Sequence, residues 1–202
     1  MDAICHGHVL SRAELADMLI EGREGVAVDR KRAFGLVEEG ARLRCHHCQG
    51  VLARCYLFGF GCAKDAARSL ALARASAGKS SKYGQSTLGN LYRLGEGGVA
   101  QDNAAAVAQY QLAAAQGYDL AQNHLGYVYI AGYGVARDYA EALRWYKLAA
   151  AQGLGASLYG VGLFYEKGYS VSADRAEAIR WYKRAAAAVL PEAADALKRL
   201  GA

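Results

Sequence analysis

The feature that most constrains the fold is an internal repeat with a period of 36 or 37 residues. The stretch DYAEALRWYKLAAAQG at 138–153 returns as DRAEAIRWYKRAAAAV at 174–189. A tandem repeat of this length is typical of a solenoid, in which each unit is one supersecondary element that stacks on the next. The aspartate that leads this stretch recurs along the chain, at Asp29, Asp65, Asp102, Asp138 and Asp174.

This register divides the chain of 202 residues into five units. The units that we expect lie at 9–44, 45–80, 81–117, 118–153 and 154–189, and together they form one repeat domain over 9–189. Residues 1–8 form a short segment before the first unit. Residues 190–202 predict a final helix that caps the stack, because Pro191 suits the first turn of a helix.

The fourth unit predicts two helices joined by a glycine turn. Leu125, Gly126 and Tyr129 share one helical face, and Gly132 follows where a helix needs a left-handed C-cap. Asp138 then offers its side chain as the N-cap of a second helix. We therefore read each unit as a helical hairpin that cannot cover its own apolar face and must stack on its neighbours.

The second helix of this hairpin carries an aromatic pair. Trp145 and Tyr146 lie on its apolar face, and we expect the pair to fill the space toward the next hairpin. Glu141, three residues after Asp138, predicts an acidic variant of the capping box at the start of the helix.

Composition agrees with an all-helical chain. The sequence is 53% hydrophobic, with alanine prominent, and has one proline, so long helices can form without interruption. Strands would need more β-branched residues. The fold class that we expect is all-α: a right-handed α/α solenoid of about five 36-residue helical hairpins plus a C-terminal capping helix.

The repeated pattern resembles the Sel-one-like repeat, a relative of the tetratricopeptide repeat. The pattern is Leu-Gly, a Tyr three residues later, Gly-x-Gly-Val-x-x-Asp, and then Ala-x-x-Trp-Tyr-x-x-Ala-Ala. The unit at 118–153 matches it throughout, its two neighbours are close, and the first two units are weaker. The resemblance implies a non-enzymatic scaffold or adaptor that binds a peptide or protein partner in a concave groove and needs no cofactor.

The resemblance also indicates which residues line that groove. In the first helix of each unit they lie three before, one after and four after the glycine of the Leu-Gly pair. The side chains at these positions vary from unit to unit, whereas the packing residues repeat. The candidate partner-binding residues are Arg54, Ser86, Asn90, Arg93, Asn123, Tyr127, Ile130, Leu163 and Glu166.

A cluster near the amino terminus suggests an alternative, a metal-stabilised or metal-sensing solenoid. If neighbouring repeats stack, two Cys/His groups could meet around zinc. The candidate ligands are Cys5, His6, His8, Cys45, His46, His47 and Cys48. Against this reading, Cys48 falls in the slot that Ala121 fills in the fourth unit, and a free cysteine packs as a small hydrophobe. Cys5 and Cys45 have no such packing explanation.

Other classes of function are disfavoured. The net charge of +5 is mild and dispersed, whereas nucleic-acid binding favours a basic stripe, so we expect no nucleic-acid partner. The segment AGKS at 77–80 lacks the first glycine of a phosphate-binding loop, and His124 has no nucleophile at repeat spacing. No run of 18 apolar residues predicts a membrane span. The amino terminus does not resemble a signal peptide, which favours a cytoplasmic location.

Overall fold

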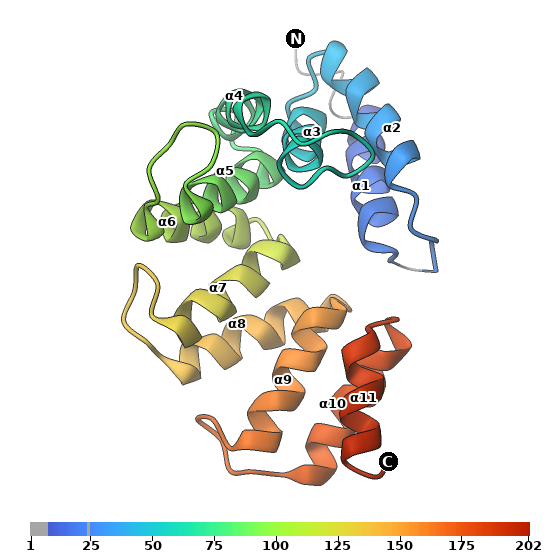
Figure 1. The fold of residues 1–202 in the computed structure, drawn as a ribbon, viewed down its shortest axis with the longest axis vertical. Coiled ribbons are helices and arrows are strands. Elements are labelled where there is room, and N and C mark those ends of the chain that lie inside the picture. Colours follow the sequence, from blue (N-terminus) through green and yellow to red (C-terminus); the bar gives the residue numbers. More distant parts are fainter. Residues whose placement is uncertain (1–7, 24) are drawn as a thin grey trace. The chain divides into compact units, whose positions relative to one another are not determined.

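The computed structural model of the chain describes residues 8–23 and 25–202, with side chains from residue 12 onward. All regular elements in these ranges are α-helices, connected by short turns (Figure 1). The helices are α1 (His8–Glu21), α2 (Arg30–Arg42), α3 (His46–Phe58), α4 (Ala66–Ala77), α5 (Lys82–Leu94), α6 (Asn103–Ala115), α7 (Asp119–Ala131), α8 (Tyr139–Ala151), α9 (Gly155–Lys167), α10 (Arg175–Ala187) and α11 (Pro191–Arg199).

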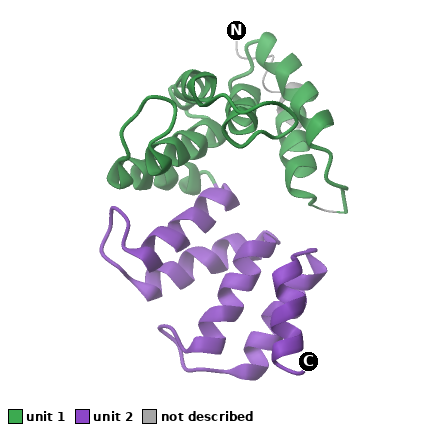
Figure 2. Cartoon of the chain, viewed as in Figure 1, with its two compact units in different colours: residues 1–116 green, residues 117–202 purple. Residues whose placement is uncertain are grey.

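The helices belong to two compact units, each larger than a single repeat (Figure 2). From here on, unit 1 means residues 1–116 and unit 2 means residues 117–202. Unit 1 holds three hairpins, α1–α2, α3–α4 and α5–α6, and unit 2 holds α7–α8, α9–α10 and the final helix α11. Within each unit the second helix of one hairpin also packs on the first helix of the next, as α4 does on α5 and α8 on α9. The predicted five hairpins and C-terminal helix are confirmed for the described part of the chain.

The repeated aspartate starts every second helix. Its side chain accepts a hydrogen bond from a backbone N–H in the first turn, for example from Glu141 to Asp138 at 3.0 Å and from Glu177 to Asp174 at 2.9 Å. These bonds satisfy N–H groups that have no partner inside the helix. The first helices of the last four hairpins end at a glycine in the left-handed region, as predicted for Gly132, where φ is 72°.

The second half of the predicted capping box is wrong. The Glu141 carboxylate does not return to the backbone of Asp138 but pairs with Arg144, at 2.9 Å between Oε2 and Nη2. The backbone N–H of Asp138 instead donates to the carbonyl oxygen of Tyr129 at 2.9 Å, which closes the turn between the two helices. The same bond joins Asp174 to Tyr165 at 2.8 Å.

A glycine and a tyrosine make the closest contact between paired helices. An added Cβ at Gly126 of α7 would lie 2.6 Å from the Tyr146 ring of α8. The same distance separates a Cβ at Gly162 from the ring of Tyr182. Real Cβ atoms do not approach a ring this closely, so the tyrosine lies where only glycine leaves space. The pair of Gly89 and Tyr110 repeats this geometry in unit 1, again at 2.6 Å.

The tyrosines, rather than the tryptophans, fill the space between helices. Tyr146 is buried, and its ring also lies 3.3 Å from the position of a Cβ at Gly160 in the next hairpin. Trp145 and Trp181 are only partly buried. The guanidinium groups of Arg144 and Arg184 lie over their rings, 4.3 and 4.4 Å from the ring centres. The expectation that both aromatic residues fill the gap is confirmed for the tyrosine, whereas the tryptophan contributes only in part: Trp181 is partly buried and packs against the hydrophobic cluster of α8 and α9.

The first two hairpins lack this tyrosine and also lack the glycine. Ala53 and Ala73 occupy the two positions in the second hairpin, and both lie in one buried cluster with Leu57. In the first hairpin the two positions hold Asp17 and Val37, which are also buried. A side chain in the first helix thus accompanies a residue smaller than tyrosine in the second, so neither hairpin places an aromatic ring against a Cβ at this contact.

Asp17 is held by a buried ion pair that joins α1 to α3. Arg54 Nη2 lies 2.8 Å from Asp17 Oδ1, and Arg54 Nη1 lies 3.4 Å from Glu21 Oε1. Asp17 and Arg54 are each only 6% exposed. The attraction between the charges therefore acts with little screening by solvent, and loss of either partner would leave a buried charge.

We predict that Gly126→Ala destabilises the protein by about 1–3 kcal/mol, because its methyl group would overlap the Tyr146 ring. Tyr146→Ala alone should cost about 3–5 kcal/mol. The double variant copies the Ala53–Ala73 pair of the second hairpin and should be less destabilised than the sum of the two changes. Chemical denaturation measures all three free energies.

Gly35→Ala is the matched control for this cycle. Gly35 lies in α2, and a Cβ there would meet nothing within 4 Å. Alanine should therefore stabilise the helix or leave it unchanged. Equal destabilisation by Gly35→Ala and Gly126→Ala, or strict additivity in the double variant, would contradict the predicted overlap.

We also predict that Arg54→Met lowers the free energy of unfolding by about 3–5 kcal/mol, because it removes the closer of the two arginines beside buried Asp17, the other being Arg23 at 3.9 Å. Arg68→Met removes an exposed ion pair with Asp65, whose N···O distance is 3.2 Å, and should cost at most about 1 kcal/mol. Denaturation of the two variants side by side tests this contrast. Similar losses of stability in the two variants would show that the buried Arg54 ion pair contributes no more to stability than the exposed Arg68 ion pair.

Candidate partner-binding face

The nine predicted partner-binding residues lie on the first helices α3, α5, α7 and α9, and we call them the binding face. Arg54, Ser86, Asn90 and Arg93 belong to unit 1. The remaining five residues, Asn123, Tyr127, Ile130, Leu163 and Glu166, belong to unit 2. The two parts of the face are described separately.

The tyrosines of the glycine contacts reach the binding face with their hydroxyl groups. Tyr110 passes over Gly89 and donates a hydrogen bond to Oδ1 of Asn90, at 2.9 Å. Tyr182 passes over Gly162 and donates to Oε2 of Glu166, at 2.6 Å. The residue that fixes the helix spacing therefore also orients a side chain of the face.

These hydroxyl groups act as neutral donors. Burial raises the pKa of Tyr110 to about 12, although the charge of Arg93 acts in the opposite direction. Burial also raises the pKa of Tyr146 to about 12. Burial and the Glu166 carboxylate raise the pKa of Tyr182. Each tyrosine therefore keeps its proton at physiological pH.

In unit 1 most of the binding face is already engaged within the chain. Arg54 is buried in its ion pair with Asp17, so its charge is neutralised there. Ser86 and Asn90 are buried as well, only 3% and 2% exposed. Arg93 is the one of the four that retains partial exposure.

In unit 2 three residues of the face support the packing of the hairpins. Asn123 Oδ1 accepts a hydrogen bond from Ser157 Oγ at 2.8 Å, which connects α7 to α9. Ile130 packs against the hydrophobic cluster of α8 and α9, and Leu163 packs against the cluster of Tyr182 that α11 completes. These three side chains are partly buried, and each takes part in packing within the unit.

Glu166 sits at the centre of a polar cluster that ties α11 to the preceding helices. Its Oε2 also accepts a hydrogen bond from Arg199 of α11 at 2.7 Å, and its Oε1 lies 3.3 Å from Lys167 Nζ. Desolvation disfavours the charged carboxylate, but the bonds from Tyr182 and Lys167 and the charge of Arg199 outweigh it and lower the pKa of Glu166. The carboxylate is therefore ionised and already compensated.

Tyr127 is the exposed member of the face. Its side chain is 43% exposed, and its ring lies 6.0 Å from that of Tyr133 in an edge-to-face arrangement. Tyr133, in the turn after α7, is 44% exposed. The two rings form an aromatic pair that is oriented by the hairpin and open to solvent.

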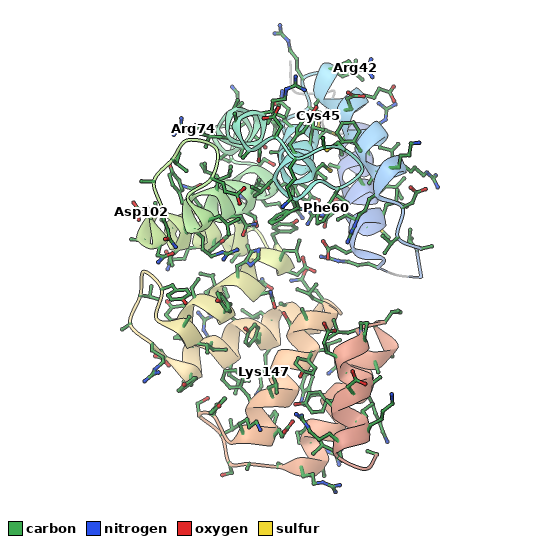
Figure 3. All side chains as sticks on the ribbon, viewed as in Figure 1. Arg42, Cys45, Phe60, Arg74, Asp102 and Lys147 are labelled. Atoms are coloured by element: carbon green, nitrogen blue, oxygen red, sulfur yellow. The ribbon has the colours of Figure 1, made fainter. Side chains whose placement is uncertain are left out.

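The described part of the Cys/His cluster has structural roles. Cys45 is the N-cap of α3 (Figure 3), and its Sγ accepts a hydrogen bond from the backbone N–H of Cys48 at 3.5 Å. This cap gives Cys45 a structural role, which the repeat pattern did not provide. Cys48 is buried, and His47 Nδ1 lies 3.1 Å from Ser81 Oγ. Within the described ranges no group of three or more His, Cys, Asp or Glu side chains is placed to hold a metal ion. Cys5, His6 and the side chain of His8 lie outside those ranges.

Sequence reasoning missed two contributors to the face. Tyr159 of α9 occupies the same position as Asn123 one repeat earlier, and its ring packs 5.2 Å from that of Tyr182. The spacing of 36 residues from Asn123 could have identified it. The second contributor is the set of tyrosine hydroxyls, because the sequence predicts only a packing role for the tyrosine of the second helix.

The sequence and the fold match known proteins. The Sel1 repeat family model matches residues 9–44, 46–80, 83–118, 119–154 and 155–189. No curated protein matches the chain. In the residues that the structure describes, no helix is long and apolar enough to cross a membrane.

Solved structures share the fold. A protective antigen of uropathogenic Escherichia coli is 32% identical over 90% of this chain, with a TM-score of 0.65, but the chain spans only 38% of that antigen's length. A Sel1 repeat protein from Oxalobacter formigenes is 29% identical, with a TM-score of 0.71, over 96% of this chain and 80% of its own. An immunity protein from Pseudomonas aeruginosa, 20% identical with a TM-score of 0.59, covers 89% of this chain and 65% of its own, and shows the fold alone.

Sel1 repeat proteins generally act as scaffolds for protein interactions and are typically not catalytic. Five tandem matches cover almost all of this chain, and its described helices form the five hairpins that such repeats predict. The chain therefore belongs to the Sel1 repeat family.

Proposed function

We propose that this chain is a non-enzymatic interaction scaffold that binds a peptide or protein partner on the binding face, with Tyr127 as its aromatic anchor. The supporting observation is the exposed pair of Tyr127 and Tyr133. The corresponding positions of other first helices are used inside the chain, by Arg54, Asn90 and Leu163. Tyr127 is the exception that offers its ring to solvent.

An exposed tyrosine on a packed frame is well suited to binding. A large ring contributes contact area with few rotatable bonds, and tyrosine is enriched among residues that dominate binding energy. Here the ring of Tyr133 already lies edge-to-face with the ring of Tyr127, at 6.0 Å between the ring centres, before any partner arrives. A partner that covers the pair therefore loses little conformational entropy from this chain.

The charges of unit 2 favour a protein partner over nucleic acid. Arg144 and Arg180 on the second helices are each paired with a carboxylate three residues earlier, at 2.9 and 2.8 Å. Paired arginines contribute little to an extended basic surface, which a phosphate backbone requires. Because Tyr127 and Tyr133 expose their rings, we propose that the partner presents an apolar or aromatic side chain to Tyr127.

We predict that Tyr127→Ala weakens partner binding at least about 30-fold, as expected for an aromatic anchor whose truncation costs about 2 kcal/mol. The full chain is used to capture binding proteins from an extract of its source organism. Each captured protein is then purified and titrated against the parent chain and the variant, so that affinity is measured with two defined components.

Leu148→Ala is the control, because Leu148 is similarly exposed, at 42%, but lies on the second helix α8. It should bind like the parent, and both variants should melt like the parent. A partner that binds Tyr127→Ala normally would move the site elsewhere. If no captured protein binds the parent saturably, the scaffold function itself is contradicted.

A further inference from the structure

We infer that Arg93 of α5 recognises a carboxylate on the partner, the side chain of an internal Asp or Glu in a peptide segment. The inference rests on the proposed function, because it concerns the part of the binding face that lies in unit 1. It adds the chemistry of the partner, which Tyr127 alone does not indicate.

The argument starts from a contrast among the arginines of the first and final helices. Arg54 is paired with Asp17 and Glu21, and Arg199 is paired with Glu166. Arg93 forms no ion pair with any carboxylate in the ranges 8–23 and 25–202, and its buried Nε has no hydrogen-bond partner there. The guanidinium is therefore partly desolvated without a counter-charge.

The surroundings of Arg93 do not supply the missing charge. The Tyr110 hydroxyl accepts a hydrogen bond from Arg93, but it is a neutral partner, because it keeps its proton and donates to Asn90. Arg93 lies in the last turn of α5, where the helix end carries a partial negative charge of only about −0.5, shared among several carbonyl groups. Gln101 Nε2 donates to the backbone carbonyl of Arg93 at 3.0 Å, which holds the backbone but leaves the guanidinium unchanged.

A carboxylate is the group that best completes this site. The planar guanidinium donates two parallel hydrogen bonds to a carboxylate, and partial burial strengthens such bonds. A phosphate backbone would need further cations along its path, but the neighbouring face residues Ser86 and Asn90 are neutral. A single cation pairs with a single carboxylate, and we commit to the side chain of an internal Asp or Glu, with a chain terminus as an outcome of the test.

The test uses a positional-scanning library of ten-residue peptides, acetylated and amidated so that side chains carry all the charge. Binding to the intact chain is measured for the parent, Arg93→Met and Arg93→Lys. We expect the parent to select Asp or Glu at one position, and replacement by Asn or Gln to weaken binding at least about tenfold. Arg93→Met should lose this preference, and Arg93→Lys should keep part of it because the charge remains.

Controls separate recognition from folding. Arg68→Met removes an exposed arginine of α4 that is already paired with Asp65, and it should select peptides like the parent. Arg93→Met breaks a hydrogen bond to the neutral Tyr110 hydroxyl but no ion pair, so it should lose much less stability than Arg54→Met. A loss comparable to that of Arg54→Met would show a structural role and overturn the inference.

The remaining outcomes distinguish the inference from the proposed function. Peptide binding without acidic selection, or acidic selection that survives in Arg93→Met, overturns the role of Arg93 and leaves the scaffold function intact. The same peptides with a free C-terminal carboxylate are measured in parallel. Binding that appears only with these peptides assigns Arg93 to a chain terminus and overturns the internal acidic residue. If no library peptide binds the parent, both the peptide mode of binding and the inference fail.

Discussion

The structure depends on the contact between a glycine of the first helix and a tyrosine of the second. Helices that lack a large side chain at the contact can approach closely, and the ring of Tyr146 then fills the remaining space between Gly126 and Gly160. The two positions vary together along the chain, since Ala53 accompanies Ala73 where glycine and tyrosine are both absent. A tyrosine ring in the second helix therefore occurs with glycine in the first, and a side chain in the first helix occurs with a smaller residue in the second.

The same contact couples packing to the binding face. The tyrosine reaches across the glycine, so its hydroxyl emerges among the polar residues of the first helix and orients Asn90 or Glu166. In the hairpins without the tyrosine, the polar residues of the face have other partners within the chain, as Arg54 has in Asp17. Most polar residues of the face thus have partners inside the chain, and Tyr127 and Arg93 stand out because they retain capacity for contacts with another molecule. We therefore expect the choice of partner to depend on one aromatic and one cationic residue rather than on all nine residues of the face.

Much of the fold was predictable because it follows from local, periodic signals. The aspartate N-caps, the glycine C-caps and the period of 36 residues each act within one or two helical turns, so their positions in the sequence determine their positions in the hairpin. The roles of neighbouring aromatic residues were less accessible. Trp145 and Tyr146 differ by one residue, about 100° around the helix, and only the packed structure shows that the tyrosine faces the glycine. Two other contacts were also not predictable from the repeat pattern. The long side chain of Arg54 reaches an adjacent hairpin, and the Cys45 thiol caps a helix.

Transplanting the glycine–tyrosine contact into the second hairpin tests the central claim most directly. The free energy of unfolding is measured for Ala73→Tyr, Ala53→Gly and the double variant. The account predicts that Ala73→Tyr alone is strongly destabilising, because the ring overlaps the Ala53 side chain, and that adding Ala53→Gly restores at least half of the loss even though glycine alone weakens a helix. A double variant that is as unstable as the sum of the single changes would contradict the claim that the tyrosine ring requires glycine at the facing position.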